Sequence, residues 1–219
     1  MKERKQIDIR GCSFDEFVSF IFDREIRAHA GEDHPWYFEV EVAFDPNRLC
    51  EFYIRLFRGP DSVLGKYSKA QLETGFWAIH GGAFDGSVQH LIWNLDVPFL
   101  SRCECVKSMS DLFRCFFAAE PLETSVSMWW DSLCYDWECG NRDRQRGGED
   151  MSMQDVIFEV LADLLQSDSE ICQGAALHGL GHLHHPSTDE LVQNYLRQHP
   201  TLGEEWKKYA LAAARFEIM

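Results

Sequence analysis

The sequence is short of basic residues: it holds 21 Lys and Arg against 36 Asp and Glu, a formal net charge of −15. An anionic surface of this kind repels the phosphates of nucleic acids and the headgroups of anionic lipids. It favours the encounter with a positively charged protein instead. We therefore expect a basic protein partner, and no binding to nucleic acids or membranes.

Long apolar runs are also missing. No stretch of about 18 apolar residues occurs that could span a bilayer, and the charged start is not followed by the apolar core of a signal peptide. A cytoplasmic protein is the resulting expectation. The eight cysteines are irregularly spaced, unlike a disulfide framework, so we expect them to remain thiols.

Motifs that define an enzyme are absent as well. There is no glycine-rich loop for phosphate, and no nucleophile motif surrounds any cysteine. Cys103 and Cys105, together with Cys134 and Cys139, lack the two-residue gap of a zinc knuckle, and burial in the core is the favoured interpretation. The sequence therefore leaves any catalytic residue unknown, and we expect no cofactor.

What the sequence does contain is ample core material. Hydrophobic residues make up 45% of the 219 residues and aromatic residues 13%, which excludes wholesale disorder. The length suits one compact domain. We divide it into an N-terminal helical region over 1–139, an exposed polar loop over 140–150, and helical hairpins over 151–219.

Helix-start signals recur along the N-terminal region. Ser13–Glu16 and Ser68–Gln71 are capping boxes, and Asp45-Pro46 places a proline where the first turn needs no amide. Each precedes apolar residues at helical spacing, and Gly59-Pro60 predicts the end of the second helix. Apolar residues alternate over Trp36–Phe44, a segment that fits a strand, a short helix or an ordered loop.

The segment 151–219 predicts two helical hairpins in tandem. Ser152 is expected to cap the first helix, and the turn Ser167–Ser169 leads into a second helix over Cys172–Leu183. Ser187–Glu190 predicts the start of a third helix, and a fourth is expected from Glu204 to about Glu217. The expected fold class is therefore all-α, with helical hairpins at the C-terminal end.

One of these hairpins resembles a HEAT repeat of the short bacterial type. The residues are the acidic turn in Leu164–Glu170 and the small-residue helix Cys172–Leu183, in which Gly179 permits a close helix approach. The sequence departs from the family pattern at Cys172, usually a branched aliphatic, and at Gln173, usually an arginine. The resemblance, confined to about residues 151–219, implies an α-α superhelix that binds other macromolecules.

His178 and His182 are the candidate metal ligands. They lie four residues apart on a predicted helix, hence on one face, and two imidazoles at this spacing can chelate zinc. In the repeat resemblance both fall at variable, usually polar positions. The favoured interpretation is a solvated helix face with no metal, and a metal-dependent enzyme that uses this face with a nearby carboxylate is the alternative.

An acidic, tryptophan-rich segment is the candidate partner-binding surface. No Lys or Arg occurs between Arg114 and Arg142. Either the tryptophans anchor a basic partner on an acidic surface, or they fill the core beneath an acidic exterior. The candidate residues are Glu120, Glu123, Trp129, Trp130, Asp131, Asp136, Trp137 and Glu138.

These features favour a non-enzymatic interaction module over an enzyme. A bacterial immunity or inhibitor protein that caps a basic toxin, such as a nuclease, is the concrete form of this hypothesis. The metal-dependent enzyme on His178 and His182 is the alternative. A HEAT-like DNA-repair glycosylase ranks last, because it needs a basic groove that this acidic chain does not offer.

Overall fold

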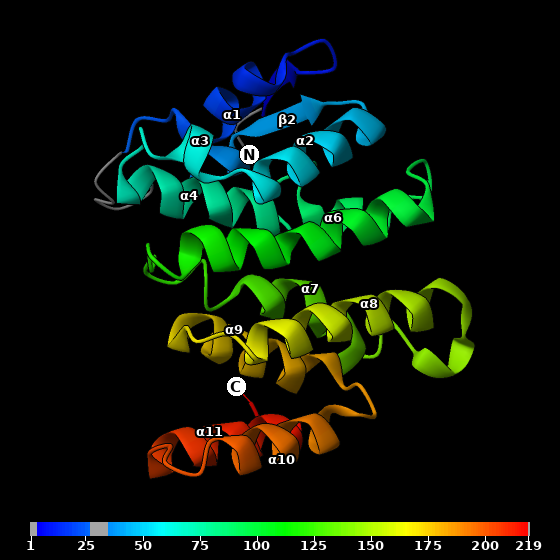
Figure 1. The fold of residues 1–219 in the computed structure, drawn as a ribbon. Helices are drawn as coiled ribbons and strands as arrows, with labels where there is room; N and C mark the ends of the chain where they lie inside the picture. The colour runs from blue at the N-terminus through cyan, green and yellow to red at the C-terminus, as the bar shows by residue number, and fades with distance from the viewer. Residues whose placement is uncertain (1–3, 27–34, 219) are drawn as a thin grey trace. The chain divides into compact units, whose positions relative to one another are not determined.

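The computed structural model describes residues 4–26 and 35–218 (Figure 1). As expected from the sequence, the fold is all-α, with one short two-stranded sheet in the described residues. The chain divides into two compact units: unit 1 is Met1–Leu112 with Leu122–Ser125, and unit 2 is Phe113–Pro121 with Val126–Met219. The division thus falls near residue 112, and not at the polar segment 140–150.

A two-stranded parallel sheet opens unit 1. Strand β1 (Lys5–Asp8) pairs with β2 (Val40–Ala43), with Lys5 opposite Val40. Val40 and Val42 point into the core, which explains the alternation that the sequence shows there. The preceding residues Trp36–Phe38 form a 3-10 turn (η1), so the segment Trp36–Phe44 combines a short helix and a strand.

Three helices of unit 1 begin where the sequence predicts them. Helix α1 (Phe14–Phe22) and α4 (Lys69–His80) both start with a complete capping box. At the start of α2 (Pro46–Arg58), the Asp45 side chain accepts hydrogen bonds from the backbone amides of Asn47 and Arg48. α1 packs against α4. Two short helices, α3 (Asp61–Leu64) and α5 (Val88–Leu91), connect these longer ones to the rest of the unit.

Helix α6 (Phe99–Leu112) packs against α2 and was not predicted from the sequence. Its buried face carries polar and small residues, among them Arg102, Cys105 and Ser108. The Arg102 guanidinium donates hydrogen bonds to the backbone carbonyls of Val97 and Ile92, at 3.0 and 3.1 Å. Val106, Met109 and Leu112 also lie on that face, but Arg102 and Ser108 interrupt the apolar residues, and this weakens the helix signal in the sequence.

Unit 2 is built around helix α9 (Glu170–Leu183). α9 packs against α7 (Trp129–Glu138), α8 (Gly148–Leu165) and α11 (Glu204–Ala214). α10 (Thr188–Gln198) pairs with α11, and the two run side by side in Figure 1. A π-helical turn, η2 (Phe113–Phe117), also contacts α9.

The polar segment 140–150 is more ordered than a loop. It contains a 3-10 turn, η3 (Arg144–Arg146), and α8 begins at Gly148, ahead of the predicted start at Ser152. Arg142 lies 3.2 Å from a carboxylate oxygen of Asp150, and Arg144 pairs with Asp155. These ion pairs tie the segment to α8, which explains the earlier helix start.

Small residues allow α9 to lie close to its neighbours. A Cβ placed on Gly179 would lie 2.5 Å from Trp130 Cβ of α7 and 3.0 Å from Leu161 Cδ2 of α8. Such distances leave no room for a side chain. The close helix approach that the sequence predicts at Gly179 is therefore present, and its neighbours are α7 and α8.

Within residues 4–26 and 35–218, the helices are all too short or too polar to cross a lipid bilayer.

Candidate functional site

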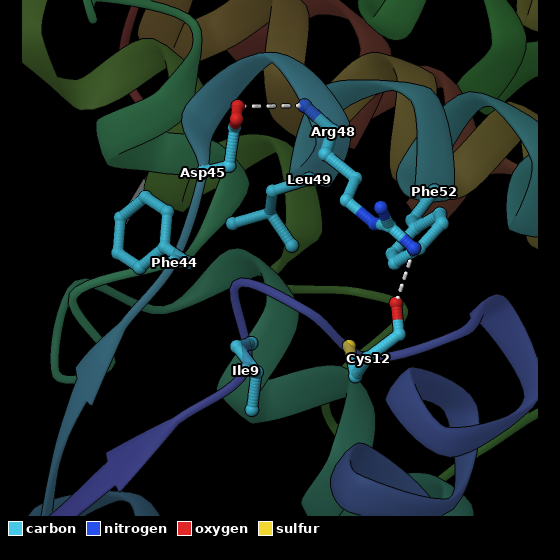
Figure 2. Close-up of a pocket in the computed structure, with 7 residues that line it drawn as sticks. All are labelled: Ile9, Cys12, Phe44, Asp45, Arg48, Leu49 and Phe52. Atoms are coloured by element: carbon cyan, nitrogen blue, oxygen red, sulfur yellow. Dashed lines mark hydrogen bonds between the residues drawn. The ribbon is translucent and has the colours of Figure 1, made fainter.

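The pocket shown in Figure 2, in unit 1, is too small for a ligand. Its cavity volume is about 10 Å³, which corresponds to about one water molecule. Arg48 lines it, and its guanidinium donates a 2.6 Å hydrogen bond to the Cys12 carbonyl and lies over the Phe52 ring. The remaining lining residues are Ile9, Phe44, Asp45 and Leu49.

A cluster of possible metal ligands lies in unit 2 instead. His178 and His182 on α9 and Asp131 on α7 each offer one ligand atom, and these atoms lie within 4.8 Å of one another. It is the single group of this kind in the part of the chain that the structure describes. The structure thus brings the candidate histidines together with an acid that the sequence assigned to a different role.

His178 is held by a phenol and has one ring nitrogen to spare. Its Nδ1 lies 3.0 Å from the Tyr209 hydroxyl of α11, whereas its Nε2 is buried and has no hydrogen-bond partner. Burial, with a smaller electrostatic contribution from the neighbouring His182, lowers the pKa of His178. His178 is therefore neutral near pH 7 and offers a lone pair.

His182 lies between two carboxylates. Its Nδ1 contacts the Glu138 carboxylate, and its Nε2 lies 3.3 Å from Asp131 Oδ1. Glu138 and Asp131 both come from α7. A neutral imidazole has one N–H, so it satisfies one of the two carboxylates; a second proton or a bound cation is needed for the other.

The expectation of a solvated histidine face is wrong. His178 and His182 are only 9% and 5% exposed. The physical reason is that α9 has helices on several sides, α7, α8 and α11, so its histidine face meets other helices and not water.

The tryptophans of the candidate partner surface are buried. Trp129 and Trp130 are fully covered and stand against the Phe113 ring, and Trp137 is 6% exposed. They fill the core, the second of the two interpretations offered by the sequence, and they cannot serve as surface anchors. Burial of large aromatic area against other rings is the ordinary use of tryptophan.

The candidate acids have separate surroundings. Asp136 accepts a hydrogen bond from Asn141 and lies 3.8 Å from Arg142, while Asp131 and Glu138 contact His182. Glu120 belongs to unit 2, and Glu123 belongs to the segment of unit 1 at Leu122–Ser125. Three of the acids are thus engaged inside unit 2.

The histidines beyond α9 take no part in the cluster. His184 adopts a left-handed conformation (φ 54°) at the end of α9 and stacks on Phe216. His185 lies 3.0 Å from Asp155 Oδ1 and stacks on Phe158. The candidate cysteines are divided, since Cys103 and Cys105 belong to unit 1 and Cys134 and Cys139 to unit 2.

Fold and site together define an all-α protein with a buried cluster of two histidines and a carboxylate. No protein-family model, no curated protein and no solved structure matches the chain. The function is therefore argued from the chemistry of the cluster.

Proposed function

We propose that unit 2 binds one divalent transition-metal ion through His178, His182 and Asp131. The convergence of the three side chains, together with a buried Nε2 of His178 that has no partner, is the observation that carries this proposal. Leaving a buried polar atom without a partner costs about 1–3 kcal/mol. A metal ion at this place satisfies that nitrogen and neutralises the carboxylate facing His182.

Zinc is the metal that these ligands favour. Imidazole nitrogen and carboxylate oxygen are both common zinc ligands, and two histidines with one carboxylate recur in zinc enzymes. With zinc–ligand bonds of about 2.05 Å, tetrahedral ligand atoms lie about 3.3 Å apart. The distance from His182 Nε2 to Asp131 Oδ1 is 3.3 Å, so this edge of the tetrahedron is already formed.

The test is a zinc titration of the purified protein by calorimetry, together with elemental analysis. We expect one equivalent to bind, and the variants His178→Ala, His182→Ala and Asp131→Asn each to lose at least ten-fold in affinity. The matched control is His90→Ala, since His90 is an exposed histidine of unit 1. Unchanged zinc affinity in the double variant of His178 and His182 would contradict the proposal.

A second function, the binding of a basic protein, is supported by the charge of the HEAT-like hairpins. No Lys or Arg occurs between Arg146 and Arg197. On this interpretation the protein is a cytoplasmic interaction module, such as an immunity protein, which does not bind nucleic acid. Exposed acids along these hairpins include Glu159, Asp163, Asp168, Glu170, Asp189 and Glu190.

Charge-reversal variants distinguish binding of a basic protein at the hairpins from a general attraction caused by the net charge of the chain. Lysine replaces four acids of the hairpins, and binding of a short lysine-rich peptide is measured at low salt. Lysine at four exposed acids of unit 1 gives the matched control. We expect a much larger loss from the first set, and equal losses would refute the hypothesis. The two sets are Asp168, Glu170, Asp189 and Glu190, and Glu25, Glu51, Asp61 and Asp85.

A further inference from the structure

We infer that the metal centre keeps an open coordination position, which takes water or a small monodentate anion. This inference rests on the proposed metal binding. The cluster supplies three ligand atoms, one each from Asp131, His178 and His182. Zinc binds four ligands, and sites with three protein ligands leave the fourth position to an exchangeable molecule.

Glu138 is the obvious candidate for a fourth ligand, and the geometry assigns it another role. Its carboxylate contacts Nδ1 of His182, whereas Nε2 of the same ring faces Asp131. The two nitrogens of an imidazole point in diverging directions, so a carboxylate bound at Nδ1 lies outside the coordination shell of an ion at Nε2. Glu138 accepts the Nδ1 proton and fixes the ring, and it is a positioning residue.

Tyr209 acts on His178 in the same way. Its hydroxyl oxygen lies 3.0 Å from Nδ1 of His178, within hydrogen-bond distance. In the tautomer that donates from Nδ1 to this oxygen, the lone pair of His178 stands on Nε2, the unpartnered atom, and a metal bound at Nε2 selects that tautomer. His182 presents Nε2 to Asp131 and His178 has an unpartnered Nε2, and each ring is held at Nδ1 by a partner on another helix.

The open position faces solvent on the α7 side. The Asp131 side chain is 26% exposed and that of Glu138 is 35% exposed, while the His182 side chain is only 6% exposed. Tyr135 is 51% exposed, and its ring centroid lies 6.4 Å from that of His182. Asp131, Tyr135 and Glu138 are spaced four and three residues apart, so they share one face of α7.

Charge selects the class of ligand. A divalent ion bound by two neutral imidazoles and the Asp131 carboxylate keeps one positive charge, which attracts an anion. Glu138 lies beside His182 and is also negative, so it disfavours bulky or multiply charged anions at the rim. Water and singly charged ligands such as azide fit these conditions.

Cobalt(II) substitution tests the open position directly. Cobalt(II) takes zinc-like coordination and absorbs visible light, so the protein with one equivalent of cobalt is titrated with azide. We expect a saturable change of the absorption spectrum. If cobalt binds and azide leaves the spectrum unchanged, the centre is closed and the inference is wrong. If cobalt does not bind at all, the proposed metal binding itself fails.

The positioning role of Glu138 gives a second test. Glu138→Gln keeps an acceptor for the Nδ1 proton, so we expect the cobalt spectrum and the azide response to remain, and Glu138→Ala to weaken cobalt binding about 10–100-fold. A changed spectrum in Glu138→Gln before azide is added would show that Glu138 is a ligand. Tyr209→Phe, on a different helix, should likewise weaken binding without changing the spectrum.

Discussion

At the scale of single residues, the two histidines of the centre differ in what holds them. His178 has a neutral partner, Tyr209, whereas His182 stands between the carboxylates of Glu138 and Asp131. Loss of the His182 imidazole therefore leaves two carboxylates of α7 without this partner, while loss of His178 leaves a phenol without its partner. Alanine at 182 should accordingly cost more stability in the metal-free protein than alanine at 178.

Gly179 sets the distance at which α7 approaches these histidines. We expect Gly179→Ala to lower the free energy of unfolding by about 1–3 kcal/mol, because its Cβ would overlap Trp130 Cβ at 2.5 Å. Asp131 follows Trp130 in the chain, so the same variant should also weaken zinc binding. Urea denaturation and the zinc titration measure the two effects.

Gly174 provides the matched control on the same helix. A Cβ there would lie 3.4 Å from the tip of the Trp206 ring, an ordinary contact. We expect Gly174→Ala to be neutral or to add up to about 1 kcal/mol, since alanine favours the helix over glycine. Equal stabilisation by the two alanine variants would contradict the close approach of α7 and α8 to Gly179.

From the sequence, His178 and His182 were candidate ligands only in the alternative interpretation, and Asp131 was not among them. Spacing alone places His178 and His182 on one helix face. Asp131, Glu138 and Tyr209 come from α7 and α11, and no local pattern shows that these helices pack against α9. Burial of the histidine face is equally invisible, because it depends on the tertiary contacts of α9 and not on its own residues.

At the scale of elements, the helices with local start signals were predictable and those held by distant contacts were not. Capping boxes marked α1 and α4. α6 has a buried arginine whose partners are backbone carbonyls, and β1 pairs with a strand far along the chain. Both depend on partners outside their own segment, which periodicity cannot report.

One such distant contact is the carboxylate of Glu73 on α4, which holds the segment Leu122–Ser125 on unit 1. It accepts hydrogen bonds from the backbone amides of Glu123, Thr124 and Ser125, at 2.9–3.0 Å, and from two hydroxyls. Burial acts to raise the pKa of Glu73, but the hydrogen bonds from Thr124 and Ser125 outweigh it, and the pKa is lowered.

We expect Glu73→Gln to destabilise unit 1 by about 2 kcal/mol at pH 7, since the amide replaces a charged acceptor. A lowered pKa in the folded protein means that this contribution is fully present above the pKa of the unfolded chain, about 4.3, and is lost as the pH falls through the folded value. Unfolding curves between pH 3 and pH 7 measure it. A difference between wild type and Glu73→Gln that does not shrink on acidification would contradict the assignment.

At the scale of the whole molecule, the chain holds two compact units, and every residue of the proposed metal centre belongs to unit 2. Binding to the folded form stabilises it in proportion to the logarithm of the free ligand concentration. The stabilisation by zinc should therefore be found in the unit that carries the ligands.

Hydrogen exchange with and without zinc tests this. At a zinc concentration about 100 times the dissociation constant, unit 2 gains about 2.7 kcal/mol, and amides of α7, α9 and α11 that exchange by opening of the unit should slow about 100-fold. Amides of α1, α2 and α4 in unit 1 should keep their rates. His178→Ala, which removes a ligand and leaves the fold of unit 1 untouched, should abolish the zinc effect. Equal slowing of both units would show that they open together, and slowing in unit 1 alone would place the metal elsewhere.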